Sequence, residues 1–171
     1  MLKESNLAEL QAELREAAAF ITPLRNEIGR IIASAAGRNR YVGYLISLAV
    51  HSYKGFRVGL DCANGSAWMI AESVFAALGA KVYCIGNTPN GLNVNEGVGS
   101  THIGHLAAFV QSNHLDAGFA FDGDADRCLA VDEQGHVLTG DHILYILGCE
   151  WLRRGMLTGN TVVTTVMSNM G

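Results

Sequence analysis

The chain has 171 residues, 49% of them hydrophobic, and is therefore long enough to bury a core of ordinary domain size. Its formal net charge of −4 argues against a nucleic-acid partner, which usually requires a basic face, so we expect none. Residues 1–16 contain acidic side chains and no apolar run, which excludes a secretory signal, and no stretch of about 18 uncharged apolar residues predicts a membrane span.

The spacing of the cysteines indicates the redox state of the cellular compartment. Four are present, and none forms a C-x-x-C pair typical of a metal or redox site: Cys62, Cys84, Cys128 and Cys149. We expect reduced, buried, structural thiols and hence a cytoplasmic protein.

The N-terminal part is predicted to be helical. Apolar residues recur at helical spacing from Leu7 to Ile21, with glutamates mostly off that stripe, and Thr22-Pro23 ends the pattern. A second helical stretch is expected from about Asn26 to Val50, with a possible break at residues 35–40.

A βαβ pattern follows from Gly55. The sequence predicts a strand over residues 56–61, a helix over 67–78 with Ser66 as a candidate N-cap, and a strand over 81–85. Gly79 is a typical helix-terminating residue. Strands joined in this way run parallel, connected by a right-handed crossover.

The rest of the chain continues the alternation of helices and strands. After a loop over residues 86–101, the expected elements are a helix to Asn113, a strand at 116–121, a hairpin of 128–131 with 136–138, a helix at 141–153 and a strand at 161–166. The predicted fold is a three-layer α/β domain with a mixed, mostly parallel sheet, preceded by N-terminal helices.

An acidic loop lies at the end of the strand over residues 116–121. Asp122, Asp124 and Asp126 alternate with small residues, so three carboxylates gather on one side of a tight turn. Their mutual repulsion is relieved by a hard divalent cation, for which oxygen is the preferred ligand. Arg127 adds a fixed cation that can bind a phosphoryl group with two nitrogens. The pattern predicts a Mg²⁺ site that serves phosphoryl transfer.

Two other interpretations of this loop remain open at this stage. Asp and Gly are common in solvated turns without any ligand. A Ca²⁺-binding loop of the EF-hand type is the second, because Glu133 falls at its twelfth position, but Arg127 occupies the place where that loop requires glycine.

A series of short motifs carries a family resemblance. In chain order they are Asp61-Cys-Ala-Asn-Gly65, Pro89-Asn-Gly-Leu-Asn-Val-Asn95, Gly99-Ser-Thr-His102, Asp122-Gly-Asp-Ala-Asp-Arg127, Val131-Asp132, Gly140-Asp141 and Val166-Met-Ser-Asn169. Together they resemble the α-D-phosphohexomutases from about Gly29 onward, most closely the bacterial members that interconvert glucosamine 6-phosphate and glucosamine 1-phosphate. Asn90 and Val98 stand where Asp and Cys are common in that subfamily, which leaves mannose or glucose phosphates as alternative substrates.

The resemblance implies a role for each residue of the acidic loop. Asp122, Asp124 and Asp126 match the family's Mg²⁺ ligands, and Arg127 matches the arginine that helps to hold the phosphoryl group. The family enzymes have four domains and react through a phosphoserine, whose oxygen supplies a further metal ligand.

The resemblance also implies a domain plan. Residues 1–28 correspond to a helical segment from the end of the preceding domain, 29–158 to the second, metal-loop domain, and 159–171 to the start of the next. The family's Ser-His-Asn-Pro nucleophile loop, Gly-Glu-x-Ser-Gly sugar loop and Arg-x-Ser-Gly-Thr phosphate loop are not found in this sequence. We therefore expect the phosphosugar to be a partner of the full-length enzyme, the remaining domains of the same chain to be the other partners, and this chain alone to have no mutase activity.

Overall fold

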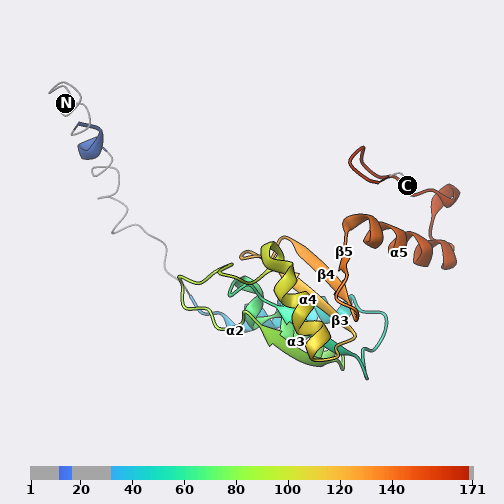
Figure 1. Ribbon diagram of the computed structural model, residues 1–171, viewed down its shortest axis with the longest axis horizontal. Helices are drawn as coiled ribbons and strands as arrows, with labels where there is room; N and C mark the ends of the chain where they lie inside the picture. The colour runs from blue at the N-terminus through green and yellow to red at the C-terminus, as the bar shows by residue number, and fades with distance from the viewer. Residues whose placement is uncertain (1–11, 17–31, 170–171) are drawn as a thin grey trace. The chain divides into compact units, whose positions relative to one another are not determined.

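The computed structural model describes residues 12–16 and 32–169 (Figure 1). The chain divides into two compact units, Met1–Ala35 and Ala36–Gly171. Within the first unit, residues 12–16 are helical, in agreement with the predicted N-terminal helix, whose other residues lie outside the described part. No helix of the described residues combines the length and the apolar character needed to cross a membrane.

The second unit is built on a five-stranded mixed sheet with the strand order β2-β1-β3-β4-β5. The strands are β1 (Arg57–Asp61), β2 (Lys81–Ile85), β3 (Ala117–Phe121), β4 (Cys128–Asp132) and β5 (Val137–Leu138). Strand β1 runs parallel to β2 and β3, whereas β4 is antiparallel to both β3 and β5. Four of the five strands therefore run in one direction, which confirms the predicted mixed, mostly parallel sheet.

Helices cover both faces of this sheet and give the predicted three layers. Helix α3 (Ala71–Ala77) packs against β1 and β2, and α4 (Ile103–Ser112) packs against β1, β3 and β4. The side chains of β1 explain the two cores, because successive residues point to opposite faces. Val58 and Leu60 belong to the core under α3, and Gly59 faces Leu106 of the core under α4.

Two further helices lie outside this central sandwich. Helix α2 (Ala35–Ser47) and helix α5 (Gly140–Arg153) bury none of their residues. The predicted break at residues 35–40 is wrong, because these residues form the first turns of α2. The part of that predicted helix before Ile32 lies outside the described residues, and residues 32–34 are not helical.

The predicted strand over residues 161–166 is also wrong. These residues form no ladder with any described strand, and Val163 and Val166 are 88% and 100% exposed. β-branched side chains favour a strand only where a neighbouring strand and a packed face receive them. The segment therefore has the composition of a strand, but no described strand pairs with it.

Side-chain capping and thiol burial also differ from expectation. Ser66 begins a short 3₁₀ turn, η1 (Ser66–Met69), whose N-cap is Gly65, so Ser66 is not the cap. Cys62 is buried and Cys84 half-buried, but Cys128 and Cys149 are exposed, so the prediction of burial fails for these two. Cys128 opens β4 at the end of its ladder, and Cys149 belongs to a helix that buries nothing.

Candidate metal centre

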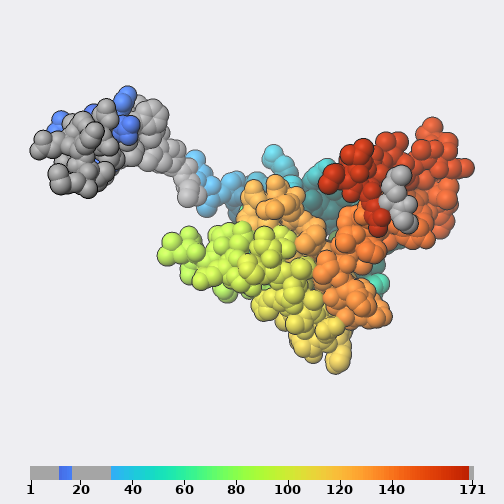
Figure 2. Space-filling model, turned by 45° about the horizontal axis from the view of Figure 1, so that its top comes forward, coloured from blue at the N-terminus to red at the C-terminus, as the bar shows by residue number. Residues whose placement is uncertain are grey.

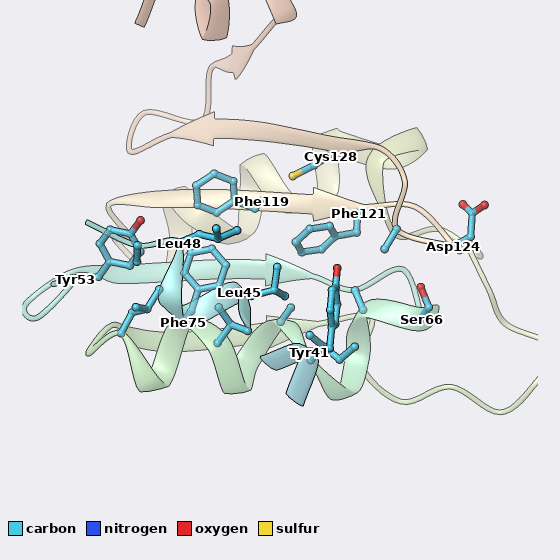
Figure 3. A pocket seen from close by; sticks show the side chains of 17 residues that line it. Tyr41, Leu45, Leu48, Tyr53, Ser66, Phe75, Phe119, Phe121, Asp124 and Cys128 are labelled. Carbon is cyan, nitrogen blue, oxygen red and sulfur yellow. The ribbon is translucent and has the colours of Figure 1, made fainter. Parts of the chain in front are cut away.

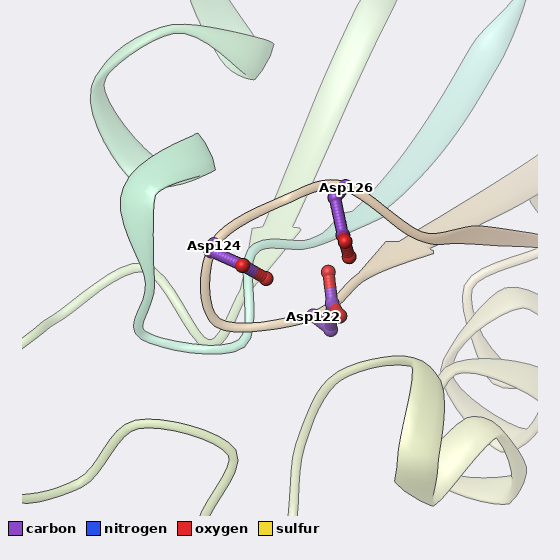
Figure 4. A group of neighbouring side chains, drawn as sticks. All are labelled: Asp122, Asp124 and Asp126. Carbon is purple, nitrogen blue, oxygen red and sulfur yellow. The ribbon is translucent and has the colours of Figure 1, made fainter.

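The three aspartates of the predicted metal loop lie together at the carboxyl end of β3. Asp122, the residue after the strand, is 1% exposed, whereas Asp124 and Asp126 are exposed. One carboxylate oxygen from each lies within 4.8 Å of the others, and Figure 4 shows the three side chains pointing into the loop that they share. The sequence-predicted group is thus one spatial cluster.

A left-handed residue at the centre of the loop produces this convergence. Ala125 has φ +60°, and its N–H donates to the carbonyl oxygen of Asp122 at 3.1 Å. An alanine in this conformation is unfavourable without compensation. The turn reverses the chain between Asp124 and Asp126, so that their side chains return toward Asp122.

A second loop, residues 61–65 at the end of the neighbouring strand β1, supports the first. The N–H of Ser66 donates to the carbonyl oxygen of Gly123 at 2.9 Å. A Cβ on Gly65 would lie 2.7 Å from the Gly123 Cα and nearer still to the Gly123 carbonyl oxygen. The two loops are therefore in direct backbone contact, which only a glycine at position 65 permits.

A third loop, residues 86–99, is tied to the second by buried polar side chains. Asp61 is fully buried; its Oδ1 accepts from the Ala63 N–H at 2.9 Å and its Oδ2 from the Gly99 N–H at 2.7 Å. The Asn64 side chain accepts from the Thr88 N–H at 3.0 Å. The loop projects from the surface in Figure 2, where it is yellow-green.

Arg127 balances part of the negative charge of the cluster. Its Nε donates to Asp122 Oδ2 at 2.6 Å and lies 3.6 Å from Asp126 Oδ1, and its backbone N–H donates to Asp122 Oδ1 at 3.2 Å. Burial acts to raise the pKa of the Asp122 carboxyl, but the hydrogen bonds from Arg127 outweigh it, so this pKa lies below its ordinary value.

The charge is not fully balanced. The hydrogen bond that Asp126 shares with Asp122, followed by repulsion from the Asp124 and Asp122 charges, raises the pKa of Asp126 above its ordinary value. Within this cluster the single guanidinium of Arg127 faces three carboxylates, so repulsion between the carboxylates remains. A divalent cation would remove this repulsion, and three carboxylate oxygens are a donor set that suits Mg²⁺.

The flanks of the loop decide against the EF-hand interpretation. An EF-hand loop joins two helices, whereas this loop joins strands β3 and β4, which are antiparallel neighbours. Glu133, the proposed twelfth position, lies beyond β4 in the turn to β5. The EF-hand alternative is therefore wrong for this chain.

Sequence reasoning identified the three aspartates and Arg127 but assigned no supporting role to Asp61. The available signal was its position: a carboxylate at the end of β1, the parallel strand beside β3, reaches the same edge of the sheet. Its two backbone hydrogen bonds hold the loops around the cluster.

An apolar cavity adjoins this cluster. It has a volume of about 570 Å³, and apolar side chains of α2, α3 and β3 line it, among them Leu45, Phe75 and Phe119 (Figure 3). Only at one end do Asp124 and Ala125 reach its wall. Its mostly apolar lining offers few groups for a charged ligand.

A sequence model of the α/β/α domain II of phosphoglucomutase/phosphomannomutase matches residues 39–135, which include β1 to β4 and the whole acidic loop. The chain belongs to this family. The family match confirms the resemblance inferred from the motifs.

Two similar proteins indicate which members of the family this chain resembles. A phosphoglucosamine mutase of Lachnospira eligens is 57% identical over 171 residues, covering 99% of this chain and 38% of the relative. One from Lachnoclostridium phytofermentans is 59% identical over 144 residues, covering 84% of this chain and 32% of the relative. The chain thus spans about a third of the length of these curated relatives.

The fold has a solved counterpart. The crystal structure of a phosphoglucomutase/phosphomannomutase family protein from Burkholderia thailandensis matches with a TM-score of 0.60 and 26% sequence identity, over 69% of this chain and 26% of that one. The match supports the α/β class predicted from the sequence.

Proposed function

We propose that this chain is the metal-loop domain of a phosphoglucosamine mutase, which interconverts glucosamine 6-phosphate and glucosamine 1-phosphate through a phosphoserine. The observation that carries the proposal is the convergence of three carboxylates on a loop after β3, within 4.8 Å of one another. The similarity to phosphoglucosamine mutases supports the choice of sugar phosphate.

In this proposal Asp122, Asp124 and Asp126 hold Mg²⁺, which when bound neutralises negative charge on a phosphoryl group. The buried Asp122 is fixed by Arg127 on one side, so its carboxylate is already oriented before a ligand arrives. The exposed Asp124 and Asp126 complete the ligand set from the solvent side.

Arg127 is the residue that we propose to contact the phosphoryl group. Its Nε edge is engaged by Asp122, which fixes the plane of the guanidinium, and the side chain is 69% exposed. The terminal nitrogens are then the donors for phosphoryl oxygens, which stabilise charge without any movement of the loop.

The nucleophile, the sugar-specificity loop and the phosphate loop are proposed to belong to other domains of the full-length enzyme. We accordingly propose that this chain alone binds metal but does not turn over phosphosugar. A coupled assay for glucosamine 1-phosphate formation on the isolated chain tests this part, and normal turnover would contradict it.

Calorimetric titration of the chain with Mg²⁺ tests the metal site. Asp124→Asn removes one charged oxygen without altering the buried Asp122, and we expect the affinity to fall on the order of tenfold or more, or about 1.4 kcal/mol. Glu133→Gln is the matched control, because it removes the same charge from an exposed residue outside the loop.

The two variants also separate the proposal from a Ca²⁺-binding module. The proposal requires Mg²⁺ binding that is weakened by Asp124→Asn and unchanged by Glu133→Gln. Tight Ca²⁺ binding that is indifferent to Asp124→Asn, or that is lost in Glu133→Gln, would count against it.

A further inference from the structure

Asn95 lies where the three loops around the carboxylate cluster meet. It belongs to the 86–99 loop, and its N–H donates to the carbonyl oxygen of Ala63 in the 61–65 loop at 2.9 Å. Its backbone is left-handed, with φ +59°, a conformation that asparagine adopts more readily than most residues. The main chain of Asn95 therefore holds the 86–99 loop against the 61–65 loop.

The side chain of Asn95 lies against the acidic loop. A Cβ on Gly123 would lie 3.1 Å from Asn95 Nδ2, and a Cβ on Gly99 would lie 3.2 Å from Asn95 Oδ1. The amide thus occupies the space between these two glycines. Because Gly123 stands between Asp122 and Asp124 in the chain, the amide limits the position of the residue that joins two carboxylates of the cluster.

Gly123 is held by both neighbouring loops. Its Cα faces the 86–99 loop, where Val94 adds a second contact: the same Cβ on Gly123 would lie 2.6 Å from Val94 Cγ1. Its carbonyl oxygen accepts from the Ser66 N–H at 2.9 Å, directly after the 61–65 loop. A shift of either loop would therefore move Gly123.

The oxygen of the Asn95 amide has no partner. Oδ1 is shielded from solvent and accepts no hydrogen bond from any residue that the structure describes. A buried amide oxygen without a donor is unfavourable for the free energy of folding, and most buried polar atoms have a partner. A hydrogen bond at this oxygen is therefore not what places the amide beside Gly123, and removal of the amide should cost the fold little.

We propose that Asn95 is a positioning residue of the candidate metal centre, whose amide, packed between Gly99 and Gly123, holds the acidic loop where its three carboxylates converge. This inference rests on the proposed metal function. Groups that orient metal ligands without touching the ion contribute strongly to metal affinity. Arg127 fixes Asp122 but donates no hydrogen bond to Asp124, so Asp124 is the ligand that loses its place when the amide beside Gly123 is removed.

Asn95→Gly tests the amide separately from the backbone, because glycine keeps the left-handed conformation and removes only the side chain. Calorimetric titration with Mg²⁺ should give a dissociation constant about tenfold higher than that of the unmodified chain. Asn90→Gly is the matched control in the same loop. The Asn90 side chain accepts from the Leu92 and Asn93 N–H groups, so its hydrogen bonds stay within that loop, and the Mg²⁺ affinity should be unchanged.

A measurement without metal separates the positioning role from the metal function. Amide hydrogen exchange followed by NMR reports on the N–H groups of Ser66 and Ala125, which donate to the carbonyl oxygens of Gly123 and Asp122. Exchange of both should be several-fold faster in Asn95→Gly than in Asn90→Gly, whereas the urea midpoints of the two variants should be similar. A merely structural role would lower the urea midpoint without selecting these two amides.

Unchanged Mg²⁺ affinity in Asn95→Gly, or an equal loss of affinity in Asn90→Gly, would overturn the positioning role. Exchange rates of the Ser66 and Ala125 amides that do not differ between the two variants would overturn it as well. If the unmodified chain binds no Mg²⁺ while both amides respond to Asn95→Gly as expected, the metal function fails and the hold of Asn95 on the acidic loop stands.

Discussion

A methyl group added at position 65 tests whether the acidic loop, residues 122–127, depends on its contact with the 61–65 loop. In Gly65→Ala the added Cβ would lie 2.7 Å from the Gly123 Cα and 2.8 Å from the Gly123 carbonyl carbon, and closer to the carbonyl oxygen. These atoms are backbone, so no side-chain rotation relieves the overlap. Either the 61–65 loop or the 122–127 loop must move.

The cost of that movement follows from two contributions. Overpacking of a closely packed site typically costs about 1–3 kcal/mol, and a shift of Gly123 weakens the hydrogen bond that it accepts from Ser66, worth about 1 kcal/mol. We expect Gly65→Ala to lower the free energy of unfolding by about 2–4 kcal/mol, a large part of the ~5–15 kcal/mol of a typical domain. It should also weaken Mg²⁺ binding, because Asp122 and Asp124 flank Gly123.

Urea unfolding followed by circular dichroism measures the loss of stability. With a slope of about 2 kcal/mol per molar urea, the midpoint should fall by roughly 1–2 M. Gly43→Ala is the matched control: the same methyl group in helix α2 meets no atom within 4 Å, so the midpoint should stay or rise, since alanine favours a helix by about 1 kcal/mol. A Gly65→Ala protein as stable as Gly43→Ala, with unchanged Mg²⁺ affinity, would refute the loop contact.

Three further perturbations address other parts of the unit. Asp61→Asn replaces one of the two oxygens that accept from a backbone N–H by an NH₂ donor, which leaves that N–H unpaired, and should cost about 1–3 kcal/mol in urea unfolding. Leu106→Ala empties a fully buried position under β1 and β3 and should cost about 2–5 kcal/mol in the same assay. Hydrogen bonds from Arg153 and Arg154 lower the pKa of Glu150 to about 2 from an ordinary 4.5, so its stabilisation of α5 is complete above pH 4.5 and is lost as the pH falls toward 2, which an NMR titration of this carboxyl checks.

The central sheet could be predicted because its signals are local and agree with one another. The strand over 81–85 has the predicted bounds, and β1 and β3 begin one residue later than predicted. In each case an apolar run ends in a Gly- or Asp-containing turn, which fixes where the strand stops. The break predicted at the start of helix α2 is wrong: Gly37 and its polar neighbours suggest a break, but a single glycine costs a helix only about 1 kcal/mol.

The failures concern residues whose structure depends on partners far away in sequence. Thr161 to Val166 has strand propensity, but a strand exists only with a ladder, and local composition does not specify one. Ser66 has the right chemistry for an N-cap, yet the contact of its N–H with Gly123 in the adjacent loop accompanies a 3₁₀ turn that begins at Ser66, so the cap position falls on Gly65. Whether Cys128 and Cys149 are buried likewise depends on tertiary packing, which the spacing of residues in the sequence does not determine.

The candidate site combines both situations: the acidic cluster is predictable from the sequence, whereas the loops that support it are not. Three carboxylates within five residues repel one another, which favours a cation site, and the spacing predicts that the three side chains gather at one turn. The support comes from residues 61–65 and 86–99, separated from the acidic loop by 23 residues or more of sequence. Asp61 holds Gly99, Gly65 abuts Gly123, and the parallel order of β1 beside β3 brings these contacts to one edge of the sheet. In the proposed metal site, the position of Asp122 depends on a buried carboxylate, Asp61, that need not touch the cation, and we predict that Asp61→Asn weakens Mg²⁺ binding even though Asp122, Asp124 and Asp126 are all intact.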